Sequence, residues 1–354
     1  MKKVLIIDDS ALMRRGVSDI IERTSEYEVG YVAKNGLEGL YYIQNYRNID
    51  AVLCDLNMPL MTGIEMLRKI NELSIDVPVI ILSSSDDSAD TITALELGAI
   101  DFIKKPERGI MRTNAEFRGA LMNALELAVK AKKSKPSKAS NVSKNKSDVV
   151  SCNKKAKVSH GGSKKLVALA CSTGGPKALQ YVLPKLPANL DAAVVLVQHM
   201  PVGFTESLAK RLDDLCDIKV KEAADNELIQ KGVVYIARGG THITVIDKNG
   251  SLYTKFDDSP PVVGLKPCAN IMYESLQNIS YDEIVCVVLT GMGADGTKGI
   301  QALSKCKHIH VIAQNQESST VYGMPRAVYE SGLVDVVCDI NKIAEEIVKK
   351  VGVQ

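Results

Sequence analysis

Residues 283–296 read EIVCVVLTGMGADG, an apolar run that ends in a turn rich in glycine. Short runs of apolar and β-branched residues bounded by glycine predict buried strands, typical of a parallel sheet. Gly291, Gly293 and Gly296 spell GxGxxG, and Asp295 lies among them. The stretch therefore fits two structures: a dinucleotide clamp, or a glycine turn that presents one carboxylate.

The same alternation of apolar runs and helical patterns extends in both directions from this stretch. It predicts a doubly wound α/β domain over residues 165–354, with a hairpin at IDKNGSLY (246–253), where Asn-Gly is a strong turn signal. Five further runs predict a five-stranded parallel sheet over residues 1–125. These runs are KVLIID, EVGYVA, AVLCDL, VPVIILSS and AIDFIKK.

Residues 126–164 separate the two predicted domains. This segment is rich in lysine and serine and nearly free of large apolar residues. Such a composition buries too little surface to offset the entropy of ordering, so we expect a flexible linker. The net charge of the whole chain is only +2, and the linker carries much of its positive charge.

Several classes of protein are excluded by composition. Every apolar run is far shorter than the roughly 20 residues of a membrane-spanning helix. Only four apolar residues separate Lys3 from Asp8, too few for a secretory signal. The eight cysteines form no CxxC pair, so neither a zinc site nor a disulfide framework is indicated. We expect a cytoplasmic protein with reduced thiols and without membrane insertion.

Polar residues follow the strands of the first predicted sheet at the point where each strand ends. The carboxyl ends of parallel strands meet at one edge, and ligands bind there. Three carboxylates in one small volume repel unless a cation neutralises them, and oxygen ligands suit Mg²⁺. A lysine and a hydroxyl beside them would bind phosphoryl oxygens. The residues are Asp8, Asp9, Asp55, Ser83 and Lys105.

The motifs VLIIDDS, CDLNMPLMTGIEML, PVIILSSS and GAIDFIKKP resemble the receiver domain of two-component response regulators, which has a flavodoxin-like fold. The resemblance implies that Asp55 accepts a phosphoryl group from a chemotaxis histidine kinase. It implies Mg²⁺ binding by Asp8, Asp9, Asp55 and the Asn57 carbonyl, and phosphoryl sensing by Ser83, Lys105 and Phe102. Lys105 is preferred to Lys104 because the family's lysine immediately precedes a proline.

Three strands of the second predicted domain end in Ser172, His199 and Asp295. Each residue taken alone fits a plainer role, as a helix cap or a buried polar residue at the sheet edge. Together they are what nucleophilic acyl transfer requires: a hydroxyl, a base and a carboxylate that orients the base. Backbone N–H groups of the nearby glycine turns would stabilise the oxyanion. Cys171, beside Ser172, is expected to pack in the core instead of acting as a nucleophile.

Two other functions remain as alternatives. An NAD-linked oxidoreductase would use the glycine motif, with Glu317 about 20 residues beyond it, but would leave Ser172 and His199 without a role. A DNA-binding response regulator would use the basic linker as an arm. The large acidic second domain lacks a helix-turn-helix pattern, so we expect no nucleic-acid partner.

Residues 166–350 resemble the catalytic domain of the chemotaxis methylesterases of the CheB family, through CSTGGP, VVLVQHMPVGFTESLAKRL, VYIARGGTHI, VVLTGMGADGTKGI and STVYGMPRAV. The resemblance implies a protein-glutamate methylesterase, activated by phosphorylation, that acts on cytoplasmic helices of chemoreceptors and deamidates receptor glutamine. It implies an oxyanion hole at the backbone of Thr173 and Met292, and no cofactor in the catalytic domain. Arg238 and Cys268 depart from the family pattern, where proline and serine are expected.

Overall fold

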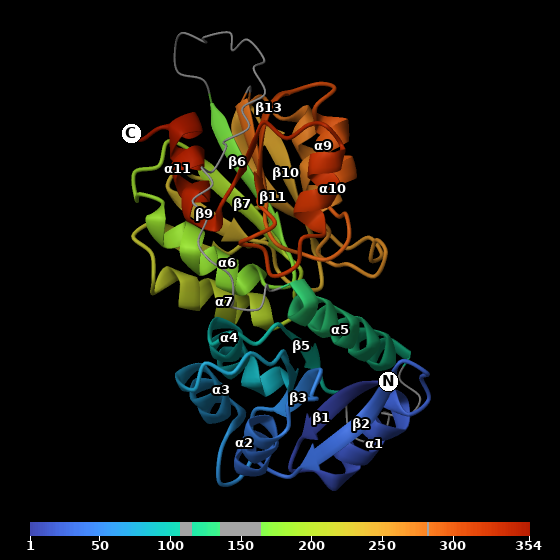
Figure 1. Cartoon of the computed structure of the whole chain (residues 1–354). Coiled ribbons are helices and arrows are strands. Elements are labelled where there is room, and N and C mark those ends of the chain that lie inside the picture. The colour runs from blue at the N-terminus through green and yellow to red at the C-terminus, as the bar shows by residue number, and fades with distance from the viewer. Residues whose placement is uncertain (107–114, 135–163, 282) are drawn as a thin grey trace, which may run out of the picture. The chain divides into compact units, whose positions relative to one another are not determined.

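The structure is a computed structural model that describes residues 1–106, 115–134, 164–281 and 283–354. The chain divides between residues 142 and 143 into two compact units. Figure 1 labels most of the elements of the two units.

The first unit contains a five-stranded sheet in which every neighbouring pair is parallel. Its central strands β3 and β4 are fully buried and apolar up to their last residues, Asp55 and Ser83, which is the pattern of a sheet covered on both faces. The predicted five-stranded parallel domain is confirmed. In spatial order the strands are β2 (Tyr27–Ala33), β1 (Lys2–Ile7), β3 (Ala51–Asp55), β4 (Val79–Ser83) and β5 (Asp101–Lys104).

Helices cover both faces of this sheet, because alternate residues of each strand point to opposite sides. Helices α1 and α5 share one core with Val4 and Ile6 of β1. Helix α2 packs against Ile7, the neighbouring residue, on the other face, and α3 lies between α2 and α4. The helices are α1 (Ala11–Ile21), α2 (Gly36–Asn45), α3 (Gly63–Glu72), the 3₁₀ turn η1 (Ser85–Asp87), α4 (Ser88–Glu96) and α5 (Ala115–Ser134).

Helix α5 continues past residue 125, where the linker was predicted to begin. Leu127, Ala128 and Val129 are buried, and Ala128 and Val129 belong to the core of the first unit. The apolar face of the helix therefore extends beyond the predicted boundary and keeps these residues on the sheet. The rest of the predicted linker that lies within residues 135–163 falls outside the described residues.

The second unit contains a seven-stranded parallel sheet with β6 at its centre, between β12 and β7. The predicted doubly wound α/β domain is confirmed. The sequence of β8, KVKE, contains no apolar run, and only one of its residues is buried because the strand forms an edge of the sheet. In spatial order the strands are β14 (Val336–Cys338), β13 (His308–Gln314), β12 (Glu283–Val288), β6 (Lys165–Cys171), β7 (Ala193–Gln198), β9 (Val233–Ile236) and β8 (Lys219–Glu222).

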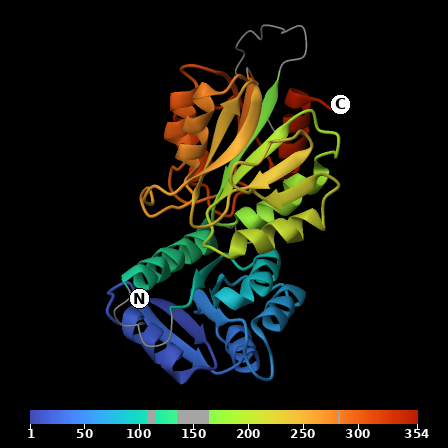
Figure 2. The same cartoon turned by 180° about the vertical axis from the view of Figure 1, so that it is seen from behind.

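Helices lie on both faces of this sheet as well, as the two opposite views in Figures 1 and 2 show. Residues of α8, α9 and α10 share a core with one face, whereas α11 contacts both α6 and β6. Among the described residues, no helix is long and apolar enough to cross a membrane. The helices are α6 (Gly175–Val182), η2 (Leu183–Lys185), α7 (Phe204–Asp213), α8 (Ala269–Ser275), η3 (Leu276–Asn278), α9 (Thr297–Leu303), α10 (Met324–Glu330) and α11 (Ile340–Val351).

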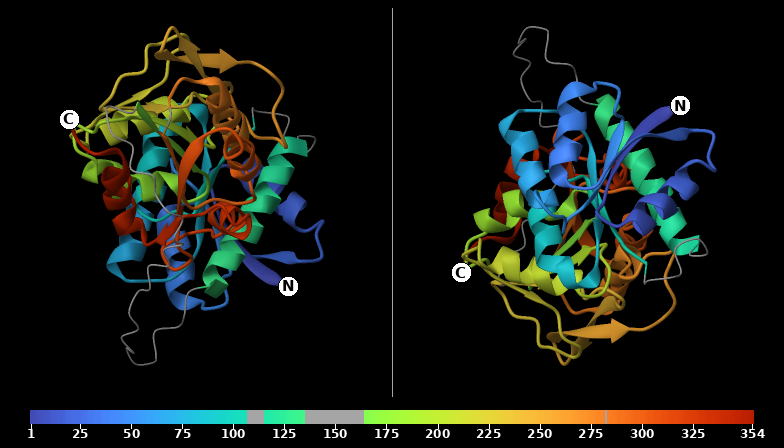
Figure 3. Two further views of the ribbon diagram at one scale, coloured as in Figure 1. Left: turned by 90° about the horizontal axis from the view of Figure 1, so that it is seen from above. Right: turned by 90° about the horizontal axis from the view of Figure 1, so that it is seen from below.

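The predicted hairpin is formed by β10 (His242–Lys248) and β11 (Ser251–Asp257), which pair in antiparallel register. Asn249 and Gly250 both have positive φ, at 54° and 82°, as a two-residue hairpin turn of the type favoured by Asn-Gly requires. Figure 3 shows the hairpin, coloured yellow to orange, at one edge of the second unit.

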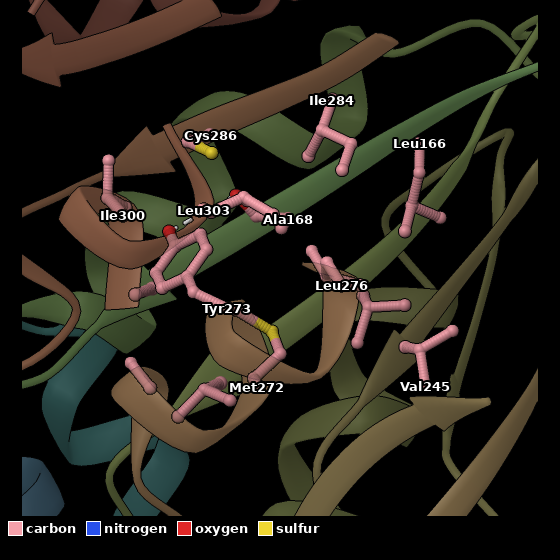
Figure 4. Packing of buried hydrophobic residues seen from close by; sticks show 14 of the residues in the cluster. Leu166, Ala168, Val245, Met272, Tyr273, Leu276, Ile284, Cys286, Ile300 and Leu303 are labelled. Carbon is pink, nitrogen blue, oxygen red and sulfur yellow. Dashed lines mark hydrogen bonds between the residues drawn. The ribbon is translucent and has the colours of Figure 1, made fainter. Parts of the chain in front are cut away.

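Tyr273 of α8 ties the helix to the centre of the sheet (Figure 4). Its fully buried hydroxyl shares its one proton between the carbonyl oxygens of Ala168 in β6, at 3.2 Å, and Val287 in β12, at 3.0 Å. A buried hydroxyl is tolerated only when it is hydrogen-bonded, so these contacts fix where α8 lies. The start of α8 is thereby held close to the ends of the two central strands.

Candidate functional site

Three adjacent strands, β12, β6 and β7, end at one edge of the second sheet. Cys171 and Gln198 are the last paired residues of β6 and β7, so Ser172 and His199 follow them directly. The His199 N–H donates to the Cys171 carbonyl at 3.2 Å, and the Ser172 N–H donates to the Thr290 carbonyl at 3.0 Å. The candidate nucleophile and base thus lie on neighbouring strand ends.

His199 and Asp295 are in direct contact. His199 Nε2 lies 2.8 Å from Asp295 Oδ2, and both side chains are largely buried. When Nε2 carries the proton and donates it to the carboxylate, Nδ1 keeps its lone pair and can act as a base. Among the described residues, the Ser172 hydroxyl makes no hydrogen bond to His199; in enzymes without substrate this contact is often long.

Asp295 is held by donors from several directions. Its carboxylate accepts hydrogen bonds from the backbone N–H groups of Ala269 at 2.6 Å, Asn270 at 3.0 Å and Gly296 at 2.9 Å. Burial alone would raise the pKa of Asp295. This effect is outweighed by the hydrogen bond from His199, by the positive charge of the protonated imidazole and by the N–H groups at the start of α8. The pKa of Asp295 is lowered to about 2, so the carboxylate is charged at neutral pH.

Asp295 and Asn270 cap each other's helices. Asp295 accepts the first N–H groups of α8, while Asn270 Oδ1 accepts the N–H groups of Gly296, at 3.1 Å, and Gly299, at 2.8 Å, at the start of α9. Each side chain satisfies donors that a helix leaves unpaired at its N-terminus. The candidate acid is therefore fixed by the packing of α8 against α9.

The glycine motif presents this carboxylate and gives Ser172 room. A Cβ atom at position 291 would lie 2.8 Å from Ser172 Cβ and 2.4 Å from Met324 Sδ, closer than packed atoms allow. Gly293 and Gly296 have φ of +80° and +91°, a conformation that favours glycine. Of the two structures that the sequence allowed, the loop has that of a turn that carries a carboxylate.

The predicted oxyanion residues lie in the turns that follow β6 and β12. The Thr173 carbonyl accepts the Thr290 hydroxyl at 3.0 Å, and Met292 follows Gly291, whose carbonyl accepts the Gly323 N–H at 3.0 Å. These contacts shape both turns, and the oxyanion role of Thr173 and Met292 stays a prediction.

Three residues that the sequence reasoning gave no catalytic or supporting role support the site: Gln198, Thr290 and Cys268. Cys268 donates its thiol to Asp295 Oδ1 at 3.2 Å; burial, followed by the charge of Asp295, raises the pKa of this thiol to about 12. Cys171 is fully buried, as predicted, and burial raises its pKa, so it remains a thiol. A polar residue that ends an apolar strand, such as Gln198, was the available signal for this support.

The first unit brings three acids together at the edge of its sheet. Carboxylate oxygens of Asp8, Asp9 and Asp55 lie within 4.8 Å of one another, an all-oxygen set that fits Mg²⁺. Lys105 Nζ lies 2.8 Å from Asp55 Oδ1 and 3.0 Å from Asp8 Oδ2, whereas Lys104 is exposed. The lysine that precedes the proline therefore contacts the acids.

Burial has the largest single effect on the pKa values of Asp55 and Lys105. Desolvation raises the pKa of Asp55 and outweighs the hydrogen bond and positive charge of Lys105. Burial would lower the pKa of Lys105, but its hydrogen bond to Asp55 and the charges of Asp8 and Asp55 raise it overall. The lysine is thus charged at neutral pH and contributes the positive charge that the acids require.

The remaining predicted residues of this edge have other contacts. The Ser83 hydroxyl lies 2.5 Å from the Thr91 hydroxyl, and the Asn57 amide donates to Asp87 at 2.7 Å. Phe102 is half-buried in β5. The sensing roles of Ser83, Lys105 and Phe102, and cation binding by the Asn57 carbonyl, stay predictions.

Two family models match the chain. A model described as CheB methylesterase matches residues 167–347, and one described as response regulator receiver domain matches residues 4–113. A relative from Geobacillus kaustophilus, named protein-glutamate methylesterase/protein-glutamine glutaminase, is 40% identical over 99% of this chain and 99% of its own length. A relative of the same name from Bacillus subtilis is 39% identical over 98% of each chain.

Among the solved structures that resemble this chain is a methylesterase catalytic domain. The crystal structure of the Thermotoga maritima CheB methylesterase catalytic domain is 40% identical in sequence, with a TM-score of 0.52. The match covers 54% of this chain and the whole of that structure. A relative from Pyrococcus horikoshii with the same name as the two above is 39% identical over 99% of this chain and 94% of its own.

Proposed function

The chain belongs to the CheB methylesterase family and carries a receiver domain, and from this premise we propose that it hydrolyses glutamyl methyl esters on chemoreceptors by a Ser-His-Asp mechanism. The observation that carries the proposal is the 2.8 Å contact between His199 and Asp295, next to the strand end that bears Ser172. The family match favours this function over the dinucleotide-binding and DNA-binding alternatives.

In the first half of the reaction, Ser172 Oγ attacks the ester carbonyl of the glutamyl side chain. His199 Nδ1 takes the hydroxyl proton, because Nε2 is bound to Asp295, and the negative carboxylate stabilises the imidazolium that forms. The tetrahedral intermediate collapses to an acyl-enzyme. The imidazolium returns its proton to the leaving methoxide, which departs as methanol.

In the second half, His199 takes a proton from water, and the oxygen of that water attacks the acyl carbonyl. The intermediate expels Ser172 Oγ, which recovers its proton from the imidazolium, and free glutamate remains on the receptor. A glutamine amide at the same position would release ammonia in place of methanol, so the same residues support deamidation.

The oxyanion of both intermediates requires donors that are already aimed at it. The backbone N–H groups of Thr173 and Met292, in the turns beside Ser172 and Gly291, are proposed for this role. Gly291 supports the assignment because its missing side chain lets the two turns approach.

The test is methanol release from membranes that carry methylated chemoreceptors. Ser172→Ala is expected to reduce kcat by about 10⁶-fold, to the level of the detection limit, because the nucleophile is lost. Ser251→Ala, which changes an exposed serine of β11, is the matched control and is expected to keep full activity. Methanol release by Ser172→Ala at the rate of the control would contradict the proposal.

We further propose that phosphorylation of Asp55 by a chemotaxis histidine kinase raises the esterase activity. Asp8, Asp9, Asp55 and the Asn57 carbonyl would hold Mg²⁺, which supplies positive charge for the acyl phosphate. Lys105 and Ser83 would then bind phosphoryl oxygens, with Phe102 responding to the movement of Ser83. The cluster of acids beside a charged lysine supports this part of the proposal.

A further inference from the structure

Gln198 is a polar residue in a place where an apolar one is expected. It ends β7 after an unbroken apolar run, and its side chain is only 2% exposed. A buried amide costs free energy unless all its hydrogen bonds are made. The partners of Gln198 are therefore informative about its role.

The amide of Gln198 binds the backbone of both the candidate nucleophile and the candidate base. Its Nε2 donates to the Ser172 carbonyl at 3.1 Å and to the His199 carbonyl at 3.2 Å. Ser172 follows β6 and His199 follows β7, so one side chain joins the two strand ends beyond the last paired residues of the ladder.

The oxygen atom of the Gln198 amide also has a hydrogen-bond partner. The Cys171 thiol donates to Gln198 Oε1 at 3.0 Å. A flipped amide would turn its oxygen toward two carbonyl oxygens and its N–H groups toward the thiol proton, so the two carbonyls and the thiol donor together favour the orientation that donates to the backbone. Gly175 leaves space for this arrangement, because a Cβ atom there would lie 1.9 Å from Gln198 Oε1.

We propose that Gln198 is a positioning residue that sets the separation of Ser172 and His199, with the Cys171 thiol orienting its amide. The proposal rests on the proposed function, in which Ser172 attacks and His199 takes the proton. A misplacement of about 1 Å between two reacting groups can cost a factor of about 100 in rate. The amide acts through the backbone and does not contact the substrate.

The first test replaces Gln198 by methionine or by glutamate. Gln198→Met keeps the length of the side chain and removes both donors, and Gln198→Glu places a carboxylate against the two carbonyl oxygens. Both are expected to lower kcat for methanol release by about 10- to 100-fold with KM within about twofold. The kcat is expressed per serine that reacts with a fluorophosphonate probe, so that unfolded protein does not count.

The matched control is Thr254→Val. Thr254 of β11 is also fully buried and also joins separate backbone segments: its hydroxyl donates to the Ala224 carbonyl at 2.6 Å and accepts the Glu227 N–H at 3.1 Å, and both partners lie outside the site. Its loss is expected to lower the melting temperature and to leave kcat per reactive serine within about threefold. Equal losses of kcat in the Gln198 and Thr254 variants would overturn the proposal.

The second test keeps Gln198 and changes the residue that orients it. Cys171→Ala removes the thiol donor and is expected to lower kcat per reactive serine by about fivefold, whereas Cys171→Ser restores a donor and most of the activity. If both Gln198 variants fail to fold, the two Cys171 variants test the proposal on their own. Equal kcat in Cys171→Ala and Cys171→Ser would overturn it.

The two proposals fail in different ways. If wild-type protein releases methanol only when Ser172 is present, but the Gln198 variants keep their kcat, the positioning role alone is wrong. If wild-type protein releases no methanol, the proposed substrate is wrong. The rate at which the fluorophosphonate probe labels Ser172 then tests the positioning role, and an unchanged rate in Gln198→Met would overturn it.

Discussion

Asp55 and Asp295 are both buried carboxylates that follow or end strands at the carboxyl edge of a parallel sheet, yet their pKa values shift in opposite directions. Asp55 is 5% exposed and its pKa is raised by burial, whereas Asp295 is 8% exposed and its pKa is lowered to about 2. Asp55 accepts one backbone N–H, from Leu56, and the Lys105 ammonium. Asp295 accepts three backbone N–H groups, a thiol and the imidazole.

The difference fits the separate roles proposed for the two carboxylates. Donors from the backbone cannot move without unfolding the loop, so Asp295 has one orientation in which it can hold an imidazole. The main partner of Asp55 is a long side chain, which can yield to a cation or follow a phosphoryl group. The carboxyl edge of a parallel sheet thus holds a fixed carboxylate in the second unit and an adaptable one in the first.

The strongest test of this comparison is Asp295→Asn. It removes the charge that stabilises the imidazolium and disturbs the tautomer of His199, so kcat is expected to fall by about 10⁴-fold with little change in KM. Steady-state methanol release measures both constants. The matched control is Asp335→Asn, since Asp335 lies 3.5 Å from another histidine, His310, and contacts neither Asp295 nor His199. Similar losses in both variants would show that Asp295 has no special role.

The second prediction concerns the adaptable site. Asp55→Ala is expected to abolish the rise in esterase activity that Mg²⁺ and a small acyl phosphate cause in the wild type, a factor of about 5 to 150 for a typical allosteric coupling. Methanol release with and without the phosphodonor measures it. Asp50→Ala, which changes another acid of the first unit, should keep the activation. A wild-type enzyme that the phosphodonor does not activate would refute the regulatory proposal.

The third prediction follows from the pKa of Asp295. A carboxylate whose pKa falls from 3.8 to about 2 on folding contributes about 2 kcal/mol of stability above pH 4, which is lost as the pH falls through 2. The difference in unfolding free energy between wild type and Asp295→Asn should therefore shrink by about 1 kcal/mol between pH 5 and pH 3. Urea unfolding at the two pH values measures it, and a difference that does not depend on pH would contradict the assignment.

The smallest effect is expected from Cys268. Its thiol is one of five donors to Asp295, so Cys268→Ala should lower kcat by no more than about threefold and stability by about 1 kcal/mol. Cys268→Ser retains a donor and should match the wild type. A tenfold loss of kcat in the alanine variant would show that the backbone donors do not suffice to fix the carboxylate.

The order of the first sheet, β2-β1-β3-β4-β5, is that of the flavodoxin-like fold that the receiver resemblance implied. The order of the second sheet could not be read from the sequence, but the residues at its strand ends could. Ser172, His199 and Asp295 are found by sequence because each follows an apolar run, and the rule that strand ends share an edge brings them together. The register of β6 against β7 is a tertiary property, so the bonds of Gln198 to both strand ends were not predictable. The reciprocal caps of α8 and α9 depend on tertiary packing in the same way.

The element boundaries failed where burial and local composition disagree. Strand β8 alternates lysine with valine and ends in glutamate, a pattern without an apolar run, and it forms because β9 offers an unpaired edge. Helix α5 passes residue 125 because its apolar residues still face the sheet after the composition begins to change. Both boundaries depend on tertiary contacts, namely the free edge of β9 and the face of the sheet that α5 covers, and local sequence contains no information about these contacts.

Strand β6 opens the described part of the second unit but completes its pairing only with β12, more than a hundred residues further along the chain. On the ribosome, the strand ends of Ser172 and His199 are therefore synthesised long before the segment that supplies Asp295. A nascent polypeptide that has not reached α9 holds a serine and an imidazole without their carboxylate. Under the proposed mechanism, hydrolytic activity arises only late in synthesis, and a polypeptide that terminates before residue 295 is expected to be inert.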